Sequence, residues 1–398
     1  MDSDQKESTT LFPDLFTIKQ FEDCFPGIML GKLLPKTSNG SHKSEYQFIP
    51  DYLKRMMRTG IWNPNDVEWF RLLHQRYQNF AENTAGRGSR ARDEEGCLPH
   101  IIPKIIHHIW LGGCLPERFQ AYRDTWRTFH PGWEMILWGD EDIENFGLVN
   151  KDQYDKASNY GEKSDIARYE ILLRYGGLYV DTDFECLASF DPFHIVCGFF
   201  AGISNTATIE INNGLIGSVP NHPILLEIVE KLGANFVTTE EKEPARPSFD
   251  VATATLQNPV ALLSSLGMAS AFLEKDDEQS VNKIIKNETS TQTIERTGPG
   301  FFTRAVMFHL QECKMCIYFS QCHDSDSSNA LNINSEKTDD RECPQNHPVI
   351  ILPPLFFFPM PNTCSGMDHT IGSLTSALDV SDQDFVYAFH HWAKSWEI

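Results

Sequence analysis

The chain has 398 residues, enough for two or three domains or for one large α/β domain with insertions. Hydrophobic residues make up 41% and charged residues 22%, a composition that excludes collagenous, coiled-coil and disordered chains. Lys and Arg total 34 against 55 Asp and Glu, so the formal net charge is −21. This charge argues against nucleic acid or an anionic membrane as the main partner. A phosphate-bearing ligand would need a cation to offset the field.

The N-terminal segment contains no basic stretch followed by an apolar one, so no secretory signal is visible. The most apolar stretches, residues 28–34 and 349–360, are shorter than the roughly 18 to 20 residues of a membrane span. We therefore expect no transmembrane segment in this chain and favour a cytoplasmic location. The ten cysteines leave the redox state open.

Residues 1–95 carry no motif with chemistry and predict a helical N-terminal extension and linker. Asn65 can cap a helix in which Phe70, Leu73, Tyr77 and Phe80 fall on one face. Residues 83–96 are rich in Gly and Arg and then acidic, which is typical of a linker. The remaining residues, 96–398, predict one catalytic-type domain with loop insertions near 236–250 and 313–347, where large apolar residues are scarce.

Strand and helix signals alternate after residue 100, which predicts an α/β fold with a parallel sheet. The expected strands and helices of the first half are strand 101–111, helix 117–129, strand 133–138, helix 160–175 and strand 178–185. The second half gives strand 214–219, a helix near 223–232 and strand 349–352. Gly298-Pro299-Gly300 resembles a phosphate loop only superficially, and we expect a turn there that opens no helix.

The densest chemical signal is the segment from Ser164 to Glu185, SDIARYEILLRYGGLYVDTDFE. Asp165 and Arg168 are three residues apart, so a carboxylate and a guanidinium project from one helix face. If the following strand continues, Asp181 and Asp183 point the same way from its carboxyl end, where ligands bind in open α/β sheets. Paired carboxylates are hard oxygen ligands suited to Mg²⁺ or Mn²⁺, which can bridge a diphosphate. The segment therefore predicts a metal and diphosphate site.

This segment resembles glycosyltransferase family 32, the sugar transferases that contain an Asp-x-Asp motif. The other matching pieces are IPKIIHHIWLGG at 102–113, Trp-x-x-x-His-Pro at 126–131, NNGLIGSVPNHP at 212–223, TGPGFFTR at 297–304 and YAFHHWAKSW at 387–396. The family includes fungal α-mannosyltransferases and is similar to the catalytic domains of clostridial glucosylating toxins. The resemblance implies a GT-A fold, which is a Rossmann-like α/β fold with a mixed, mostly parallel sheet. It also implies retaining transfer from a nucleoside-diphosphate sugar and a divalent cation, usually Mn²⁺.

Carried over by position, the resemblance implies that Asp183 binds the metal directly and that Asp181 contacts the donor and meets the metal through water. Asp165 and Arg168 would hold the donor sugar and its diphosphate. The aromatic face of Trp110 would stack on the nucleotide base, and Asn213 would line the site.

The C-terminal segment YAFHHWAKSW supplies the remaining candidates. A neutral imidazole is a good Mn²⁺ ligand, and we choose His390 as the third ligand, with His391 as the rival. In a strand only one of these neighbours can face the site, so the sequence does not decide between them. Ser395 and Trp396 match the family's terminal Ser-Trp and are expected to close over the diphosphate.

The expected activity is that of a retaining, Mn²⁺-dependent (or Mg²⁺-dependent) hexosyltransferase, with mannose first among the sugars. The donor would be GDP-mannose or a UDP-sugar, and the acceptor a glycan or glycolipid hydroxyl. The alternatives are a nucleotide-sugar-binding module with weak or no activity and a nucleotide-sugar hydrolase. The Golgi is the family-based alternative to the cytoplasm. Donor, acceptor and oligomeric state are not determined by the sequence.

Overall fold

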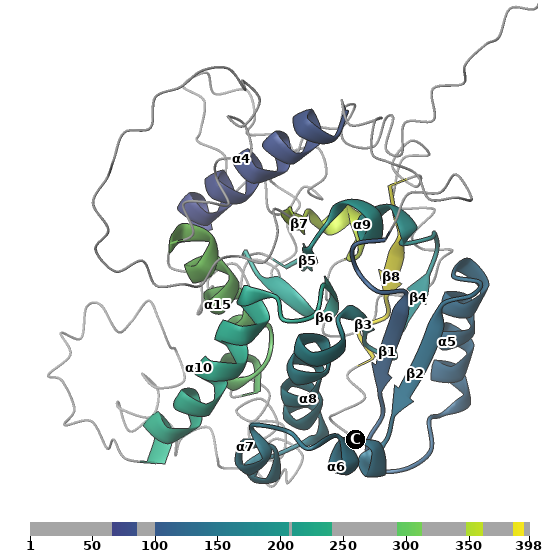
Figure 1. Ribbon diagram of the computed structural model, residues 1–398, viewed down its shortest axis with the longest axis vertical. Helices are drawn as coiled ribbons and strands as arrows, with labels where there is room; N and C mark the ends of the chain where they lie inside the picture. Colours follow the sequence, from purple (N-terminus) through teal and green to yellow (C-terminus); the bar gives the residue numbers. More distant parts are fainter. Residues whose placement is uncertain are drawn as a thin grey trace, which may run out of the picture.

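The computed structural model describes residues 66–85, 100–206, 209–240, 293–312, 348–360 and 385–393. A six-stranded sheet with the order β2-β1-β3-β6-β5-β7 forms the centre, and β4 and β8 form a separate two-stranded sheet (Figure 1). The strands are β1 (Ile105–Ile109), β2 (Glu134–Trp138), β3 (Gly177–Val180), β4 (Phe184–Cys186), β5 (Phe199–Ile203), β6 (Ile211–Ser218), β7 (Val349–Leu352) and β8 (Ala388–His390).

The central sheet is mixed but mostly parallel. β1 is parallel to β2 and β3, and β5 is parallel to β7. β6 is antiparallel to both of its neighbours, β3 and β5, so it alone runs against the other five strands. The expected α/β class with a mixed, mostly parallel sheet is therefore confirmed.

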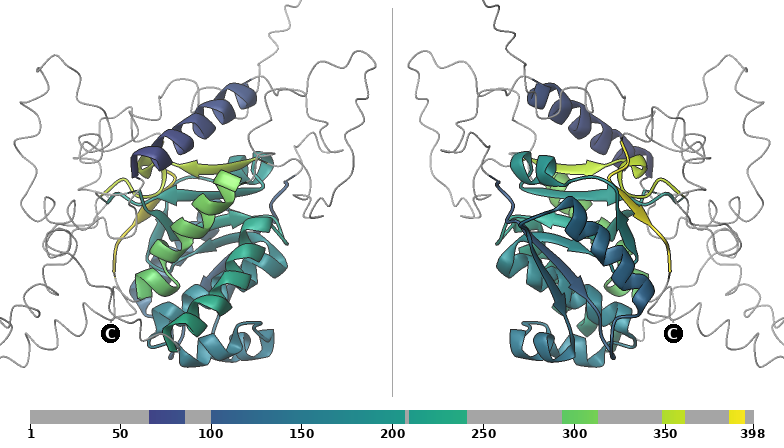
Figure 2. Two further views of the ribbon diagram at one scale, coloured as in Figure 1. Left: turned by 90° about the vertical axis from the view of Figure 1, so that its left-hand side faces the viewer. Right: turned by 90° about the vertical axis from the view of Figure 1, so that its right-hand side faces the viewer.

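Helices cover both faces of the central sheet. They are α4 (Asp66–Ala85), α5 (Glu117–Phe129), α6 (Asp140–Phe146), α7 (Lys151–Lys156), α8 (Tyr160–Tyr175), α9 (Asp191–Val196), α10 (Pro223–Glu240) and α15 (Pro299–Glu312), with a 3-10 turn at Pro354–Phe356. α8 packs against β3 and β6, α10 packs against α8, and α15 packs against β6. Figure 2 shows α10 and α15 in front of the sheet from one side and α5 from the other. α8 is thus enclosed between the sheet and α10, and most of its middle residues are buried.

Local signals explain the limits of α8. Its first turn is capped by Asn159, whose side chain accepts a hydrogen bond of 2.9 Å from the backbone N–H of Glu162. The helix ends at Tyr175 and is followed by Gly176, which has a φ of 63°, and by Gly177, which has a φ of 95°. A Cβ atom on Gly177 would lie 2.6 Å from the carbonyl oxygen of Ile105 in β1. The two glycines therefore permit both the sharp turn into β3 and its close approach to β1.

α4 is the described part of the expected N-terminal extension. The predicted stripe of Phe70, Leu73, Tyr77 and Phe80 is buried and joins the main hydrophobic core. α4 packs against β7, and the Arg76 guanidinium donates a 2.7 Å hydrogen bond to the carbonyl oxygen of Leu310 in α15. The helix is thus part of the packed structure.

Five expectations about element limits were wrong, and one of them is the strand expected over 214–219, which is β6 and runs over Ile211–Ser218. The strand expected over 101–111 is limited to β1, and the strand expected over 178–185 is divided into β3 and β4 by a turn. α10 continues to Glu240, inside the range 236–250 that we expected to be a loop, and most of that range lies outside the described residues. α15 begins at Pro299, so the glycine-rich segment does open a helix, as the fixed φ of a proline at the first helical position favours.

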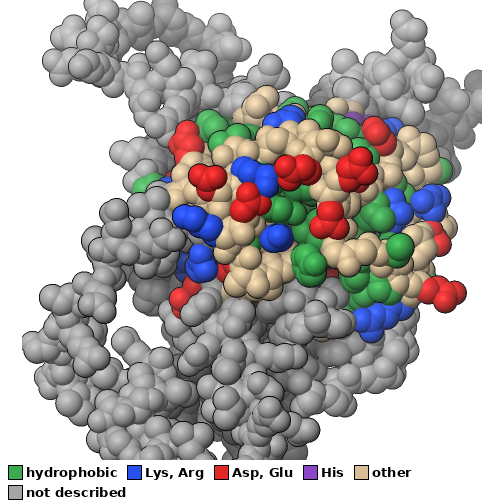
Figure 3. Space-filling view, turned by 90° about the horizontal axis from the view of Figure 1, so that it is seen from below, with side chains coloured by type: hydrophobic (Ala, Val, Ile, Leu, Met, Phe, Trp, Pro, Cys, Tyr) green, Lys and Arg blue, Asp and Glu red, His purple; other side chains and the backbone are tan. Residues whose placement is uncertain are grey.

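The face formed around α6 and α7 carries side chains of both charges. Seen from below, acidic and basic groups are interspersed around apolar side chains (Figure 3). Lys151, for example, lies between two carboxylates, 2.6 Å from Asp155 and 3.4 Å from Glu144. Within the described parts of the chain, no helix has the length and apolar character needed to cross a bilayer.

Candidate active site

A charged pair is buried on the sheet-facing side of α8. Asp165 and Arg168 are 5% and 4% exposed, and Nη2 of Arg168 lies 3.0 Å from Oδ1 of Asp165. Nη1 of Arg168 lies 3.2 Å from Oδ1 of Asp181 and donates a 2.9 Å hydrogen bond to the carbonyl oxygen of Asn213 in β6. The guanidinium carbon lies 4.5 Å from the centre of the Tyr179 ring. Arg168 therefore connects α8, β6 and the end of β3.

Neutral side chains complete the environment of Asp165. Its Oδ1 accepts a 2.8 Å hydrogen bond from Nδ2 of Asn213, and its Oδ2 accepts one of 2.8 Å from Oγ1 of Thr297. The Tyr169 hydroxyl donates to the carbonyl oxygen of Thr297 at 2.7 Å and accepts from Asn213 at 2.9 Å. We call Asp165, Arg168, Asn213, Thr297 and Tyr169 the buried network.

Thr297 and Tyr169 are members that the sequence analysis missed. Tyr169 follows Arg168 on the same helical face as Asp165, at a spacing of four residues, so the helical period could have revealed it. Thr297 is 132 residues from Asp165, and only its place at the start of TGPG marked it.

Burial and charge act against each other in the buried network. Burial raises the pKa of the Asp165 carboxyl to about 6, although Arg168 and the donors Thr297 and Asn213 lower it. Burial alone would lower the pKa of Arg168, but the neighbouring Asp181, Tyr179 and Asp165 outweigh that cost and raise the pKa. Arg168 therefore stays charged, and Asp165 is ionised at neutral pH.

Asp181 and Asp183 lie in the turn that follows β3, because β3 ends at Val180. The expectation that strand alternation aligns the two side chains was therefore wrong, although the turn still brings both carboxylates close to His390. The turn closes with a hydrogen bond from the Phe184 N–H to the carbonyl oxygen of Asp181. Oδ1 of Asp181 accepts a 2.7 Å hydrogen bond from the Tyr179 hydroxyl. Tyr179, two residues earlier, is a site neighbour that the period of a strand could have revealed.

β8 decides which of the two neighbouring histidines faces these aspartates. Nε2 of His390 lies 3.1 Å from Oδ1 of Asp183. His391 points elsewhere, with its Nε2 3.2 Å from Glu185 and its ring stacked on Tyr122 at 4.1 Å between ring centres. The side chains of adjacent strand residues point in opposite directions, and the pairing of Phe184 with His390 fixes which one faces the site.

The segment around β8 also holds Asp183 through its backbone. The N–H of Ala393 donates a 2.8 Å hydrogen bond to Oδ2 of Asp183, and the N–H of His391 donates to its carbonyl oxygen at 3.0 Å. The His390 ring lies between the rings of Phe184 and Trp392, at 4.3 and 4.1 Å between ring centres.

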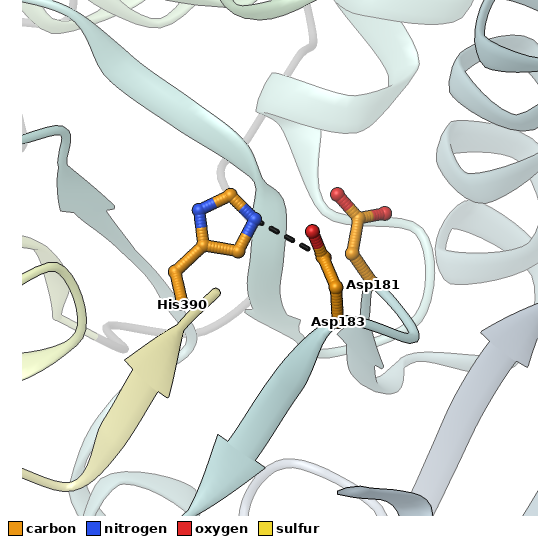
Figure 4. Close-up of side chains that lie close together, drawn as sticks. All are labelled: Asp181, Asp183 and His390. Atoms are coloured by element: carbon orange, nitrogen blue, oxygen red, sulfur yellow. Dashed lines mark hydrogen bonds and ion pairs between the residues drawn. The ribbon is translucent and has the colours of Figure 1, made fainter. Parts of the chain in front are cut away.

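Asp181, Asp183 and His390 form a group that we call the ligand cluster. One potential ligand atom from each residue lies within 4.8 Å of the others, and Figure 4 shows the two carboxylates and the imidazole side by side. The donor set of two carboxylate oxygens and one imidazole nitrogen suits Mn²⁺ or Mg²⁺. Together with Asp165, the site contains three carboxylates but one guanidinium. The two uncompensated negative charges fit a divalent cation.

The two aspartates of the ligand cluster have different electrostatic environments. Burial raises the pKa of Asp181 despite the attraction of Arg168, and the negative charge of Asp183 raises it further. For Asp183, burial is outweighed by His390 and by the backbone N–H of Ala393, so its pKa is lowered. Asp183 is thus the more firmly ionised of the two.

The remaining sequence-predicted residues are placed as follows. Trp110 comes directly after β1, is partly exposed and packs against Phe119 at 5.1 Å between ring centres. Asn213 lies in β6 within the buried network. Ser395 and Trp396 lie outside the described residues.

Part of the chain matches a known family model. Residues 116–196 match the family model described as "Glycosyltransferase sugar-binding region containing DXD motif". This range contains α8, β3 and both aspartates of the ligand cluster. This segment is therefore similar to the sugar-binding region of that glycosyltransferase family, and the resemblance drawn from the sequence is confirmed.

Individual relatives cover part of the chain. The chain is 34% identical over 135 residues to "Inositol phosphoceramide mannosyltransferase 3" of Schizosaccharomyces pombe, covering 33% of this chain and 37% of that protein. It is 36% identical over 141 residues to "Mannosyl phosphorylinositol ceramide synthase SUR1" of Saccharomyces cerevisiae, covering 34% and 35%. The match thus spans about a third of the length of these curated relatives. Among solved structures, the catalytic domain of alpha-toxin from Clostridium novyi is similar with a TM-score of 0.35 and 9% identity, over 67% of this chain and 84% of that one.

Proposed function

We propose that this protein is a metal-dependent glycosyltransferase that moves a hexose from a nucleoside-diphosphate sugar to a hydroxyl group with retention of configuration. The observation that carries the proposal is the position of the ligand cluster. Asp181 of this cluster shares Arg168 with Asp165 of the buried network, inside the sequence range that matches the sugar-binding family. Support for retention comes from the family resemblance.

The residues divide the proposed chemistry between them. Asp183 and His390 would hold the cation, and Asp181 would complete the set. A divalent cation in this position supplies Lewis-acid stabilisation of the nucleoside diphosphate that leaves. Arg168 adds a fixed positive charge next to it, and Asp165 and Asn213 provide carboxylate and amide groups toward the sugar. Trp110, Ser395 and Trp396 stay proposed donor contacts from the sequence.

We propose mannose as the transferred sugar and a glycolipid or glycan hydroxyl as the acceptor. The support is that one relative named above is an inositol phosphoceramide mannosyltransferase and the other a mannosyl phosphorylinositol ceramide synthase. GDP-mannose is therefore the first donor to test and UDP-sugars are the second. The expected cytoplasmic location gains no support from the structure or the relatives.

The test uses the purified chain with GDP- and UDP-sugars, with and without Mn²⁺, and with and without glycan and glycolipid acceptors. Transfer predicts that nucleotide release requires both Mn²⁺ and an acceptor, and that the product has the anomeric configuration of the donor by NMR. Release without an acceptor would identify a hydrolase. Donor binding is measured by the rise in melting temperature that a bound ligand causes. Donor binding without release of the nucleotide would identify an inactive binding module.

A further inference from the structure

Gly214 in β6 lies directly beside the first aspartate of the ligand cluster. A Cβ atom built on Gly214 would be 2.5 Å from Oδ2 of Asp181 and 2.9 Å from Oδ1 of Asn212. Gly214 is not among the residues with positive φ, so its backbone conformation is open to other residue types. The glycine is therefore required for space, and the Asp181 carboxylate occupies that space.

The Asp181 carboxylate has little freedom to move away from Gly214. Its Oδ1 is held by the Tyr179 hydroxyl at 2.7 Å and by Nη1 of Arg168 at 3.2 Å. The backbone N–H of Asp181 donates a 2.7 Å hydrogen bond to the carbonyl oxygen of Gly214. With Oδ1 engaged in this way, Oδ2 is the oxygen that lies over Gly214.

Hydrogen bonds within β6 and to the neighbouring loop also hold the backbone of Gly214 in place. Its N–H donates a 2.7 Å hydrogen bond to Oδ1 of Asn212, and Nδ2 of Asn212 donates a 3.0 Å hydrogen bond to Oγ of Ser204. Asn212 is 6% exposed and Ser204 is fully buried. The strand cannot retreat without breaking buried hydrogen bonds, which is costly. A side chain at position 214 would consequently displace the carboxylate.

We infer that Gly214 is a positioning residue of the ligand cluster, which by having no side chain leaves room for the Asp181 carboxylate to lie beside Asp183 and His390. The inference rests on the proposed function in one respect: the expected consequence of adding a side chain at position 214 is weaker cation binding. The steric conflict between such a side chain and Asp181 does not depend on the proposed function. Asn212 supports the same arrangement by fixing the Gly214 N–H. The residue acts through Asp181 and need not touch the substrate.

A double-mutant cycle tests the steric part without metal or substrate. Gly214→Ala is compared with the wild type, and Gly214→Ala/Asp181→Ala is compared with Asp181→Ala, each by its denaturation midpoint. We expect a clear loss of stability in the first comparison and a smaller loss in the second, because removing the carboxylate removes the closer clash and leaves only the 2.9 Å approach to Oδ1 of Asn212. Gly139→Ala is the matched control, since a Cβ there would meet its nearest atom at 3.6 Å and should show no coupling to Asp181. Equal losses in both Gly214→Ala comparisons would overturn the inference.

The second measurement is the affinity for Mn²⁺ alone, read from the electron paramagnetic resonance signal of the free ion. We expect Gly214→Ala to bind Mn²⁺ at least ~10-fold more weakly than the wild type, as changes to groups that orient metal ligands do. Gly139→Ala should bind it as the wild type does. Unchanged affinity in Gly214→Ala would overturn the positioning role. If the wild type binds no Mn²⁺ while the cycle still shows relief, the metal-dependent function fails and the steric role of Gly214 toward Asp181 stands.

Discussion

The buried network and the ligand cluster lie side by side but satisfy their charges differently. In the buried network each polar group of Asp165 has a partner, and the guanidinium of Arg168 is shared between carboxylates and a backbone carbonyl. In the ligand cluster two carboxylates lie close together beside the imidazole of His390, and of these two carboxylates Arg168 contacts Asp181. The comparison indicates that the buried network stabilises the fold as well as the site, whereas the ligand cluster is built for a ligand that carries positive charge.

Removing Arg168 is expected to have the largest effect. Arg168→Ala leaves the buried Asp165 and the partly exposed Asp181 without their cation, and breaking a buried ion pair such as that with Asp165 costs about 3–5 kcal/mol of stability. Chemical denaturation measures the loss. The control is Arg127→Ala, which breaks an exposed pair with Asp124 and should cost less than about 1 kcal/mol. Equal stability of the two variants would refute a structural role for the buried network.

Removing Asp183 is expected to abolish function while leaving the fold. Asp183→Ala removes a proposed cation ligand, and we expect turnover to fall by about 100-fold or more, as for loss of one group that stabilises transition-state charge. Its denaturation midpoint should change far less than that of Arg168→Ala, because the variant also removes repulsion toward Asp181. Asp155→Ala, at an exposed carboxylate, is the control. Full Mn²⁺-dependent turnover in Asp183→Ala would exclude the proposed metal site.

The two adjacent histidines provide a paired test of the ligand cluster. His390→Ala should weaken Mn²⁺ binding by roughly 10- to 100-fold, the range for perturbed metal sites. His391→Ala should bind Mn²⁺ nearly as the wild type does, because its ring faces Glu185 and Tyr122. Isothermal titration with Mn²⁺ measures both. The opposite order of affinities would show that His391 is the ligand.

The smallest loss of stability is expected when Thr297 is replaced, because this residue acts on the pKa of Asp165. That pKa is raised to about 6, above its value of 3.8 in an unfolded chain, so stability falls as the pH rises from 3.8 to about 6 and Asp165 loses its proton. Because the Thr297 hydroxyl lowers the pKa, Thr297→Val should raise it, extend this fall to higher pH and cost about 1 kcal/mol at neutral pH.

The pH dependence of the activity should also depend on the ionisation of Asp165. If ionised Asp165 binds the donor, kcat/KM declines below about pH 6, and Thr297→Val moves this decline to higher pH. Thr303→Val is the matched control for the pH profile, because its buried hydroxyl bonds the backbone of Pro299 and of Ile211 and does not bond Asp165. An unchanged pH profile in Thr297→Val would contradict the assignment.

Local rules were sufficient for much of the fold. The limits of α5 and α8 and of β7 agree with the sequence prediction, because each is marked within a few residues by a cap, a glycine pair or an apolar β-branched run. The break between β3 and β4 was missed. β-Branched and aromatic residues continue through this segment, and only the pairing of β4 with β8, which starts some 200 residues later, removes Phe184 from the central sheet.

The excess of acidic residues and the spacing of Asp165, Arg168, Asp181 and Asp183 were fixed by the sequence alone, and they pointed to a cation and a phosphate-bearing ligand before any geometry was known. Tertiary structure decided that His390 and not His391 contacts the Asp183 side chain, that Thr297 contacts Asp165, and that Asp181 fills the space beside Gly214. The physical reason is separation along the chain. Helical and strand periods align residues a few positions apart, whereas contacts across 132 or 207 positions depend on which strands pair and how helices pack.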